Sequence, residues 1–124
     1  MPSLSRDYSV NYNWAVWGYT DFESYGVNAV SIDFFKMGLE PGTAQLNRYN
    51  LALQVFNKTN NAWSTVETKT GSYNAHEQPT VRFFLSNKLA GGQYRIRCYG
   101  SYGTALVVKM FDYDNGTAAF LVKR

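Results

Sequence analysis

The sequence lacks several features that common classes of protein require. It contains a single cysteine, Cys98, so it cannot form an intramolecular disulfide. Charged residues make up only 17% of its 124 residues, which argues against a disordered chain or a coiled coil. No apolar run approaches the roughly 20 residues of a membrane-spanning helix. No helical repeat of apolar residues continues for three turns.

Familiar catalytic and metal-binding motifs are also missing. There is no phosphate-binding glycine loop, no cluster of metal ligands and no recognisable catalytic triad. The only histidine, His76, adjoins Glu77 in a polar stretch, and we interpret it as an exposed loop residue. Asp112 and Asp114 precede Gly116 at a spacing that departs from that of a calcium loop. We therefore expect no cofactor, no metal and no catalytic centre.

What the sequence does contain is a large share of apolar and aromatic residues. Hydrophobic residues reach 45%, and aromatics reach 17% through 10 Tyr, 8 Phe and 3 Trp. This content is enough for one core, so residues 1–124 are predicted to form a single domain, with residues 1–7 as a flexible N-terminal tail. The net charge of +3 comes from scattered basic residues, which is not the pattern of a nucleic-acid binder.

Alternation of apolar and polar residues recurs along the chain, as in half-buried strands. In residues 93–99, Tyr94, Ile96 and Cys98 share one face and Arg95 and Arg97 the other, which makes Cys98 a buried thiol. The other predicted strands are residues 8–16, 28–36, 49–55, 63–68, 81–85, 105–111 and 118–122. We predict an all-β protein, a two-sheet antiparallel β-sandwich that is jelly-roll-like and has about eight strands.

Turn-forming residues separate these strands. Polar residues 57–61 predict a hairpin turn between residues 49–55 and 63–68. Residues 71–79 are predicted as a surface loop, and residues 100–103 and 114–116 as tight turns, because they are rich in Gly, Asn, Asp and Ser. Val30 is expected to point inward together with Ile32 and Phe34.

A family resemblance follows from residues 89–98, LAGGQYRIRC, and the apolar strand predicted after the next glycine turn. This arrangement resembles the closing strands of pre-peptidase C-terminal (PPC-type) domains, which are secreted jelly rolls appended to bacterial proteases and collagenases. An earlier strand of that family, Asp-Leu-Asp-Leu-aromatic, is similar to residues 50–56, NLALQVF, in its hydrophobic positions. Its acidic positions are missing here. The resemblance therefore implies a secreted jelly roll, without support for a calcium site.

Aromatic residues close to turns form the main candidate binding surface. Exposed Tyr and Trp rings stack on sugars and make contacts at low entropic cost, although such rings also cap the ends of sandwich cores. Arg95 and Arg97 can hold a carboxylate, sulfate or phosphate group bidentately, and an ordinary polar outer face is the alternative. The predicted ligand-binding residues are Trp17, Tyr19, Trp63, Arg95, Arg97, Tyr99 and Tyr102.

These features predict a secreted, extracellular and non-catalytic binding module. Its expected partner is a polysaccharide or another cell-surface or matrix polymer, with no nucleic acid. One alternative is a small secreted toxin, bacteriocin or pore-forming protein that acts at a membrane surface, with residues 63–71 as an insertion hairpin. The other alternative is a structural or assembly subunit that forms a homo-oligomer.

Overall fold

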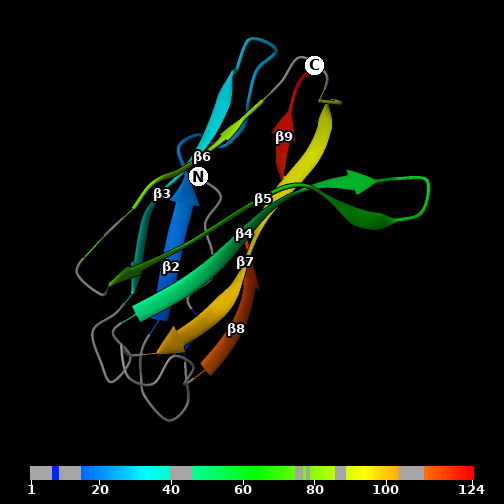
Figure 1. Ribbon diagram of the computed structural model, residues 1–124. Helices are drawn as coiled ribbons and strands as arrows, with labels where there is room; N and C mark the ends of the chain where they lie inside the picture. Colours follow the sequence, from blue (N-terminus) through cyan, green and yellow to red (C-terminus); the bar gives the residue numbers. More distant parts are fainter. Residues whose placement is uncertain are drawn as a thin grey trace.

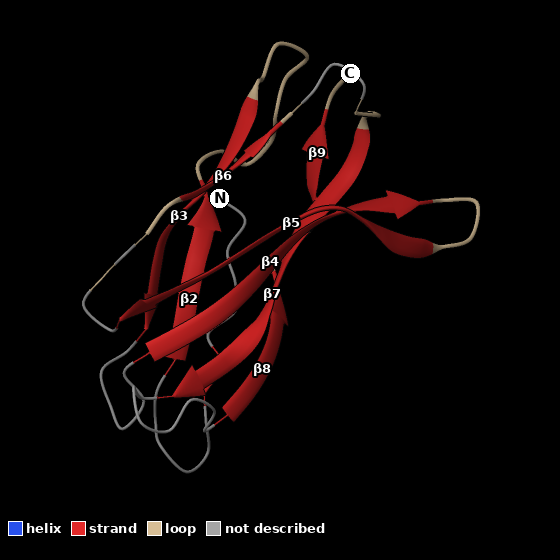
Figure 2. Cartoon of the chain, in the orientation of Figure 1, coloured by secondary structure: helices blue, strands red, loops and turns tan. Residues whose placement is uncertain are grey.

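The computed structural model describes residues 7–8, 15–39, 46–74, 77, 79–85, 89–103 and 111–124 of the chain (Figure 1). Within these residues the regular elements are nine strands, joined by turns and extended segments (Figure 2). The strands are β1 (Asp7–Tyr8), β2 (Ala15–Thr20), β3 (Ser31–Leu39), β4 (Leu46–Asn57), β5 (Ala62–Asn74), β6 (Val81–Phe84), β7 (Gly92–Gly103), β8 (Phe111–Gly116) and β9 (Phe120–Val122).

The strands form two antiparallel sheets. One has the order β1-β2-β3-β6, and the other has the order β5-β4-β7-β8, with β9 also paired to β7. Both sheets contribute to one buried cluster, in which Ile32, Phe34 and Phe83 of the first sheet meet Leu53 and Ile96 of the second. The predicted all-β, two-sheet antiparallel sandwich is therefore confirmed.

The connections between strands give a finer description of the sandwich. The chain forms the hairpin β2–β3 in one sheet, crosses to the hairpin β4–β5, returns to β6 beside β3, and crosses again to β7 beside β4. This is the Greek-key order of immunoglobulin-type sandwiches, in which hairpins within one sheet alternate with crossings to the other sheet. The jelly-roll part of the prediction is therefore not confirmed.

The start of β7 carries a second sign of this architecture. The hydroxyl of Tyr94 donates a hydrogen bond of 2.5 Å to the carbonyl oxygen of Ala90, four residues upstream. A tyrosine bonded in this way, where the chain enters the strand from the other sheet, is the tyrosine corner of immunoglobulin-type domains. Gly92 between them has a φ of 152°, a backbone conformation that side chains disfavour. The segment on which the PPC resemblance depends is thus a corner that fixes the register of β7.

Three turn predictions were wrong. Residues 71–74 continue β5 instead of opening a loop, and they pair with β4 down to Leu46. Residues 100–103 continue β7 and pair with β4 as well, while residues 114–116 lie in β8 and pair with β7. In each case hydrogen bonding to a neighbouring strand outweighs the local turn preference of Gly, Asn and Asp.

Two smaller predictions also need correction. Val30 lies before the start of β3, at the end of the sheet and on the rim of a pocket, and its side chain is 72% exposed. Asp7, predicted to belong to the tail, pairs with Val16 in the ladder of β1 and β2. Residues 1–6, residues 9–14 of the predicted 8–16 strand, residues 105–110 of the predicted 105–111 strand, and His76 lie outside the described residues.

The ladder between β4 and β5 contains a close contact that only glycine allows. Gly71 pairs with Tyr49, and the Tyr49 ring lies across it, so that a Cβ atom at position 71 would sit 2.5 Å from the Tyr49 hydroxyl oxygen. Tyr49 also packs against Tyr73, with ring centroids 5.9 Å apart. An aromatic ring that covers a cross-strand glycine restores the packing that glycine lacks.

We expect Tyr94→Phe to lower the free energy of unfolding by about 1 to 3 kcal/mol, because the buried corner loses its hydrogen bond and leaves the Ala90 carbonyl without it. Urea denaturation measures this loss as a lower midpoint at unchanged slope. Tyr99→Phe is the matched control, since Tyr99 is exposed on the same strand. Equal midpoints for the two variants would contradict the role assigned to the corner.

Candidate functional site

Four of the seven predicted ligand-binding residues lie on one face of the five-stranded sheet. Arg95 of β7 pairs with Gln54 of β4, and Gln54 in turn pairs with Thr65 of β5. Directly opposed residues of an antiparallel ladder point to the same side, so these side chains share one face. Arg97 and Tyr99 are an even number of residues from Arg95, and Trp63 is two residues from Thr65, so their side chains point to the same side. Ile96, between the two arginines, is buried in the core. We call this surface, opposite to the core, the outer face.

Arg95 is the most closely held side chain of the outer face. Its guanidinium carbon lies 4.4 Å from the centroid of the Trp63 ring, at cation–π distance. Its Nε donates a hydrogen bond of 2.7 Å to Oε1 of Gln54. The Gln54 amide is itself fixed, because Nε2 donates to Oγ1 of Thr65 at 3.1 Å. A chain of contacts from three strands therefore sets the position of one positive charge.

Trp63 makes two contacts with its neighbours on the outer face. Its ring contacts Phe56 of β4, with centroids 5.3 Å apart, in addition to the Arg95 guanidinium. The ring is half-buried between these neighbours and supports Arg95 from the side. Tyr99 is more accessible, at 38% exposed, and the Arg97 guanidinium carbon lies 5.8 Å from its ring centroid. Of these two predicted residues on the outer face, Tyr99 is thus the more accessible ring.

The other three predicted ligand-binding residues lie on the other sheet or further along β7. Trp17 and Tyr19 belong to β2 in the four-stranded sheet, where they pair with Gly38 and Phe35. Tyr19 is half-buried. Tyr102 lies in β7 and pairs with Asn47 of β4, beyond Tyr99 in the ladder. The side chains of Trp17 and Tyr102 lie outside the described part of the structure.

Sequence reasoning missed the contribution of β4 to the outer face. Gln54 occupies a polar position of the predicted 49–55 strand, yet it is 7% exposed and connects Arg95 to Thr65. Asn50 donates from Nδ2 to the carbonyl oxygen of Tyr99 at 3.4 Å. The signal for these residues was the alternation itself, but their partners become visible only when the order β5-β4-β7 is known.

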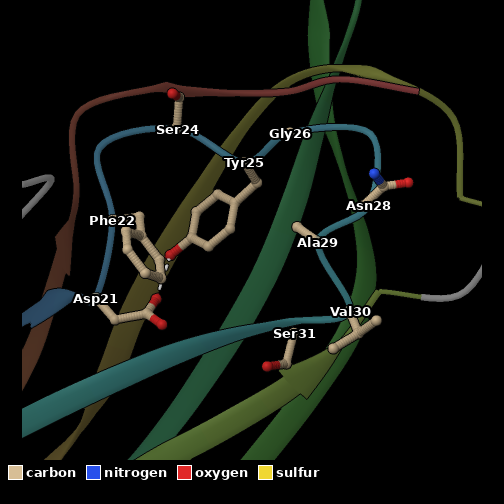
Figure 3. A pocket seen from close by; sticks show the side chains of 9 residues that line it. All are labelled: Asp21, Phe22, Ser24, Tyr25, Gly26, Asn28, Ala29, Val30 and Ser31. Atoms are coloured by element: carbon tan, nitrogen blue, oxygen red, sulfur yellow. Dashed lines mark hydrogen bonds between the residues drawn. The ribbon is translucent and has the colours of Figure 1, made fainter.

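A second feature is a pocket of about 380 Å³ in the loop between β2 and β3. Figure 3 shows the Tyr25 side chain pointing toward Asp21, with Phe22 beside both. The Tyr25 hydroxyl donates to Asp21 Oδ1 at 2.6 Å, and the same oxygen accepts from the Asp33 amide at 3.2 Å. Exposed Phe22 and Val30 form the apolar part of the rim.

Tyr25 also joins the loop to the second sheet. It forms a parallel bridge with Val122, and its ring packs against Phe120 with centroids 5.6 Å apart. Arg124 strengthens the junction, because its Nη2 donates to the carbonyl oxygen of Ala29 at 3.1 Å and its Nη1 to that of Val27 at 3.1 Å. The pocket is therefore built mainly from residues that close one end of the sandwich.

The described residues contain no group of three or more His, Cys, Asp or Glu side chains that could hold a metal ion. Cys98 is fully buried, as its position in the pattern predicted. The best-defined ion pair joins Asp33 to Arg82 on the outside of the other sheet, with the Arg82 Nε 2.7 Å from Asp33 Oδ1, and the Arg82 guanidinium lowers the pKa of Asp33. A pair of this kind stabilises the surface modestly.

Comparisons with known proteins add no further assignment. No family model matches the sequence, and neither the curated proteins nor the solved structures give a significant match. In the described parts of the chain, no helix is long and apolar enough to cross a membrane. The resemblance to PPC-type domains and every statement about function therefore stay predictions.

Tyr25 leads to a prediction about pH. Burial and the hydrogen bond to Asp21 raise the pKa of Tyr25 well above its ordinary value of 10.0. In the unfolded chain the phenol ionises near pH 10, whereas in the folded chain it keeps its proton. The stability linked to this proton is thus fully present below about pH 10 and is lost as the pH rises above it.

We expect urea unfolding to require less free energy at about pH 11 than at about pH 8, and Tyr25→Phe to show a smaller difference between the two conditions. Wild-type protein and variant are each measured at both pH values. The variant lacks the hydrogen bond to Asp21 at either pH, so this loss cancels from its difference between the two pH values. The buried Tyr73, whose pKa burial also raises, remains in the variant and keeps part of the alkaline loss. An unchanged difference in the variant would refute the prediction.

Proposed function

We propose that the chain is a non-catalytic, secreted binding module that holds a polysaccharide or another cell-surface polymer on its outer face. The observation that supports this most directly is the gathering of Arg95, Arg97 and Tyr99 on one sheet face, with Trp63 and Gln54 fixing Arg95. Charged forks, an accessible ring and amide groups on one surface suit a ligand with many hydroxyl groups.

The shape of the outer face suits an extended ligand. Strand β4 has 12 residues and β5 has 13, and a strand of this length extends roughly 40 Å. Together with β7 they form a long twisted surface, and the β4–β5 hairpin continues past the other strands at the right of Figure 1. Hydroxyl side chains follow β5 on this surface, at Thr65, Thr68 and Thr70. A polymer therefore has room for several contacts in a row.

The extracellular location and the polymer partner are both part of this proposal. Extracellular location rests on the composition, which is rich in Tyr, Asn, Gly, Ser and Thr. Residues 63–71, the predicted insertion hairpin of the toxin alternative, are paired with β4 at every position except Val66, and this pairing gives no support for insertion into a membrane. Release of dye from liposomes would favour the toxin alternative over the binding module.

The assembly alternative has one observation in its favour. Strand β5 is at the edge of its sheet, and none of the described strands pairs with its outer side. However, the ladder has an irregularity at Leu53 and Gln54 that leaves Val66 without a partner, and Glu67 and Lys69 carry charge along the edge. Bulges and charges are common protection against edge-to-edge pairing. A molar mass in light scattering that corresponds to a stable oligomer would favour the assembly alternative.

The binding module can be tested with an array of cell-wall and matrix polysaccharides, followed by titration of the polymer that binds best. We expect Tyr99→Ala to weaken that binding about tenfold, or about 1.4 kcal/mol, because the accessible ring of the outer face is removed. Phe84→Ala is the matched control: Phe84 is 65% exposed but belongs to β6 in the other sheet.

Two results would count against the proposal. An array without any specific binding would reject the polysaccharide part. Equal losses in Tyr99→Ala and Phe84→Ala would show that the outer face does not carry the ligand. Denaturation midpoints of both variants, compared with the wild type, ensure that any loss of affinity reflects contact and not unfolding.

A further inference from the structure

The pocket in the loop between β2 and β3 lies apart from the outer face. Its lining consists of side chains between Asp21 and Ser31, and none of these lining residues belongs to the five-stranded sheet. Its volume of about 380 Å³ is near the lower end of the roughly 300 to 1,000 Å³ that small-molecule sites occupy. The pocket therefore has room for one compact ligand rather than for a stretch of polymer.

The walls of this pocket are held in place without a ligand. The Tyr25 amide donates to the Leu121 carbonyl oxygen at 2.9 Å, and the Tyr25 carbonyl oxygen accepts from the Lys123 amide at 2.8 Å. The Arg124 guanidinium holds the next part of the loop, because it donates to three carbonyl oxygens of residues 26–29. A preformed site loses little conformational entropy when a ligand binds.

Asp21 supplies the strongest hydrogen-bond acceptor of the pocket. Its Oδ1 is occupied, because it accepts from the Tyr25 hydroxyl and the Asp33 amide. Within the described part of the chain, no hydrogen bond reaches Oδ2 of Asp21, the hydroxyl of Ser31 or the side-chain amide of Asn28. In the view of Figure 3, the Asp21 and Ser31 side chains both lie below the Tyr25 ring. A carboxylate oxygen, a hydroxyl and an amide are thus available to a ligand that carries hydroxyl groups.

The Phe22 ring adds an apolar surface beside these polar groups. It is 61% exposed, and it meets the Tyr25 ring at right angles with centroids 6.1 Å apart. This contact orients the Phe22 ring while most of its surface stays open to solvent. A sugar ring has the same two parts, since its C–H groups are apolar and its hydroxyl groups are polar.

The charges around the pocket favour a neutral ligand. Asp21 is the one charged side chain among the described residues that line it, so an anion meets repulsion there and no basic partner. Arg82 carries a positive charge close enough to interact electrostatically with Asp21, while it donates two hydrogen bonds to Asp33. This positive charge offsets the attraction of Asp21 for a cation. A neutral ligand with several hydroxyl groups is therefore the best match.

We propose that the pocket binds one neutral sugar unit, as a free sugar or at the end of a chain. Asp21 and Ser31 form hydrogen bonds with the sugar hydroxyls, and Phe22 packs against the C–H face of the sugar ring. This inference goes beyond the proposed function. The pocket is separate from the outer face, so it binds its sugar whether or not the outer face holds a polymer.

The experiment titrates the protein with the methyl glycosides of glucose, galactose, mannose and N-acetylglucosamine and follows its amide signals by two-dimensional NMR. We expect one of these sugars to shift the signals of residues 21–31 with a dissociation constant on the order of 1 mM. Equal affinity for a trisaccharide that ends in the same sugar would support recognition of a chain end, whereas binding of the methyl glycoside alone would support recognition of a free sugar. A trisaccharide that binds more than about tenfold tighter would overturn the single-unit site.

Variants test the two parts of the pocket. Asp21→Asn should weaken binding about tenfold, since the amide keeps an oxygen for the Tyr25 hydroxyl but replaces the open carboxylate oxygen with a donor. Glu23→Gln is its matched control, because it removes the same charge from the same loop and Glu23 does not line the pocket. Phe22→Ala should also weaken binding about tenfold, and its control is Val27→Ala. Both residues are 61% exposed in this loop, but Val27 does not line the pocket.

Several results would overturn the inference. One is a titration in which no sugar shifts the signals of residues 21–31. Another is an equal loss of affinity in Phe22→Ala and Val27→Ala, or in Asp21→Asn and Glu23→Gln, when denaturation midpoints show that all four variants are folded. Choline that binds tighter than every sugar would show that the pocket selects a cation.

The NMR signals also separate this inference from the proposed function. Shifts confined to Tyr99 and its neighbours on the outer face would overturn the pocket and support the outer face instead. Shifts confined to residues 21–31, with no polysaccharide bound on the array, would support the pocket and count against the outer face.

Discussion

The two-residue period of β7 is the constraint on which both the core and the candidate site depend. Tyr94, Ile96 and Cys98 are buried on one side of this strand, while Arg95 and Arg97 lie on the other. Because β7 pairs with β4, β8 and β9, its register sets the position of the whole five-stranded sheet. A slip of one residue would exchange the two sets, and the tyrosine corner opposes such a slip at the point where the strand begins.

The many aromatic residues do not form one large stacking surface. Many rings are structural: Tyr25 and Phe120 close one end of the sandwich, and Tyr49 and Tyr73 pack together along the β4–β5 ladder. Trp63 lies on the outer face but supports Arg95 there. The surface is thus defined as much by held charge and amide groups as by exposed rings.

Much of the fold could be predicted from alternation alone, since Ile32, Phe34 and Ile96 are buried as the alternation predicted. Errors arose where local turn chemistry opposed a ladder, as at residues 100–103, because the pairing with β4 is set by residues far away in the sequence. The candidate site divides in the same way. Arg95 and Arg97 followed from one strand, whereas the contact of Arg95 with Trp63 required the order of three strands.

The contact between Gly71 and Tyr49 has a consequence for how this sequence can diverge. The ring occupies the space that a Cβ atom at position 71 would need, so position 71 can take a larger residue only if position 49 takes a smaller one. Tyr49 also packs against Tyr73, which limits how far the ring can move aside. Among homologous chains, any residue larger than glycine at position 71 should accompany a smaller residue at position 49, and this covariation would identify the β4–β5 ladder from sequences alone.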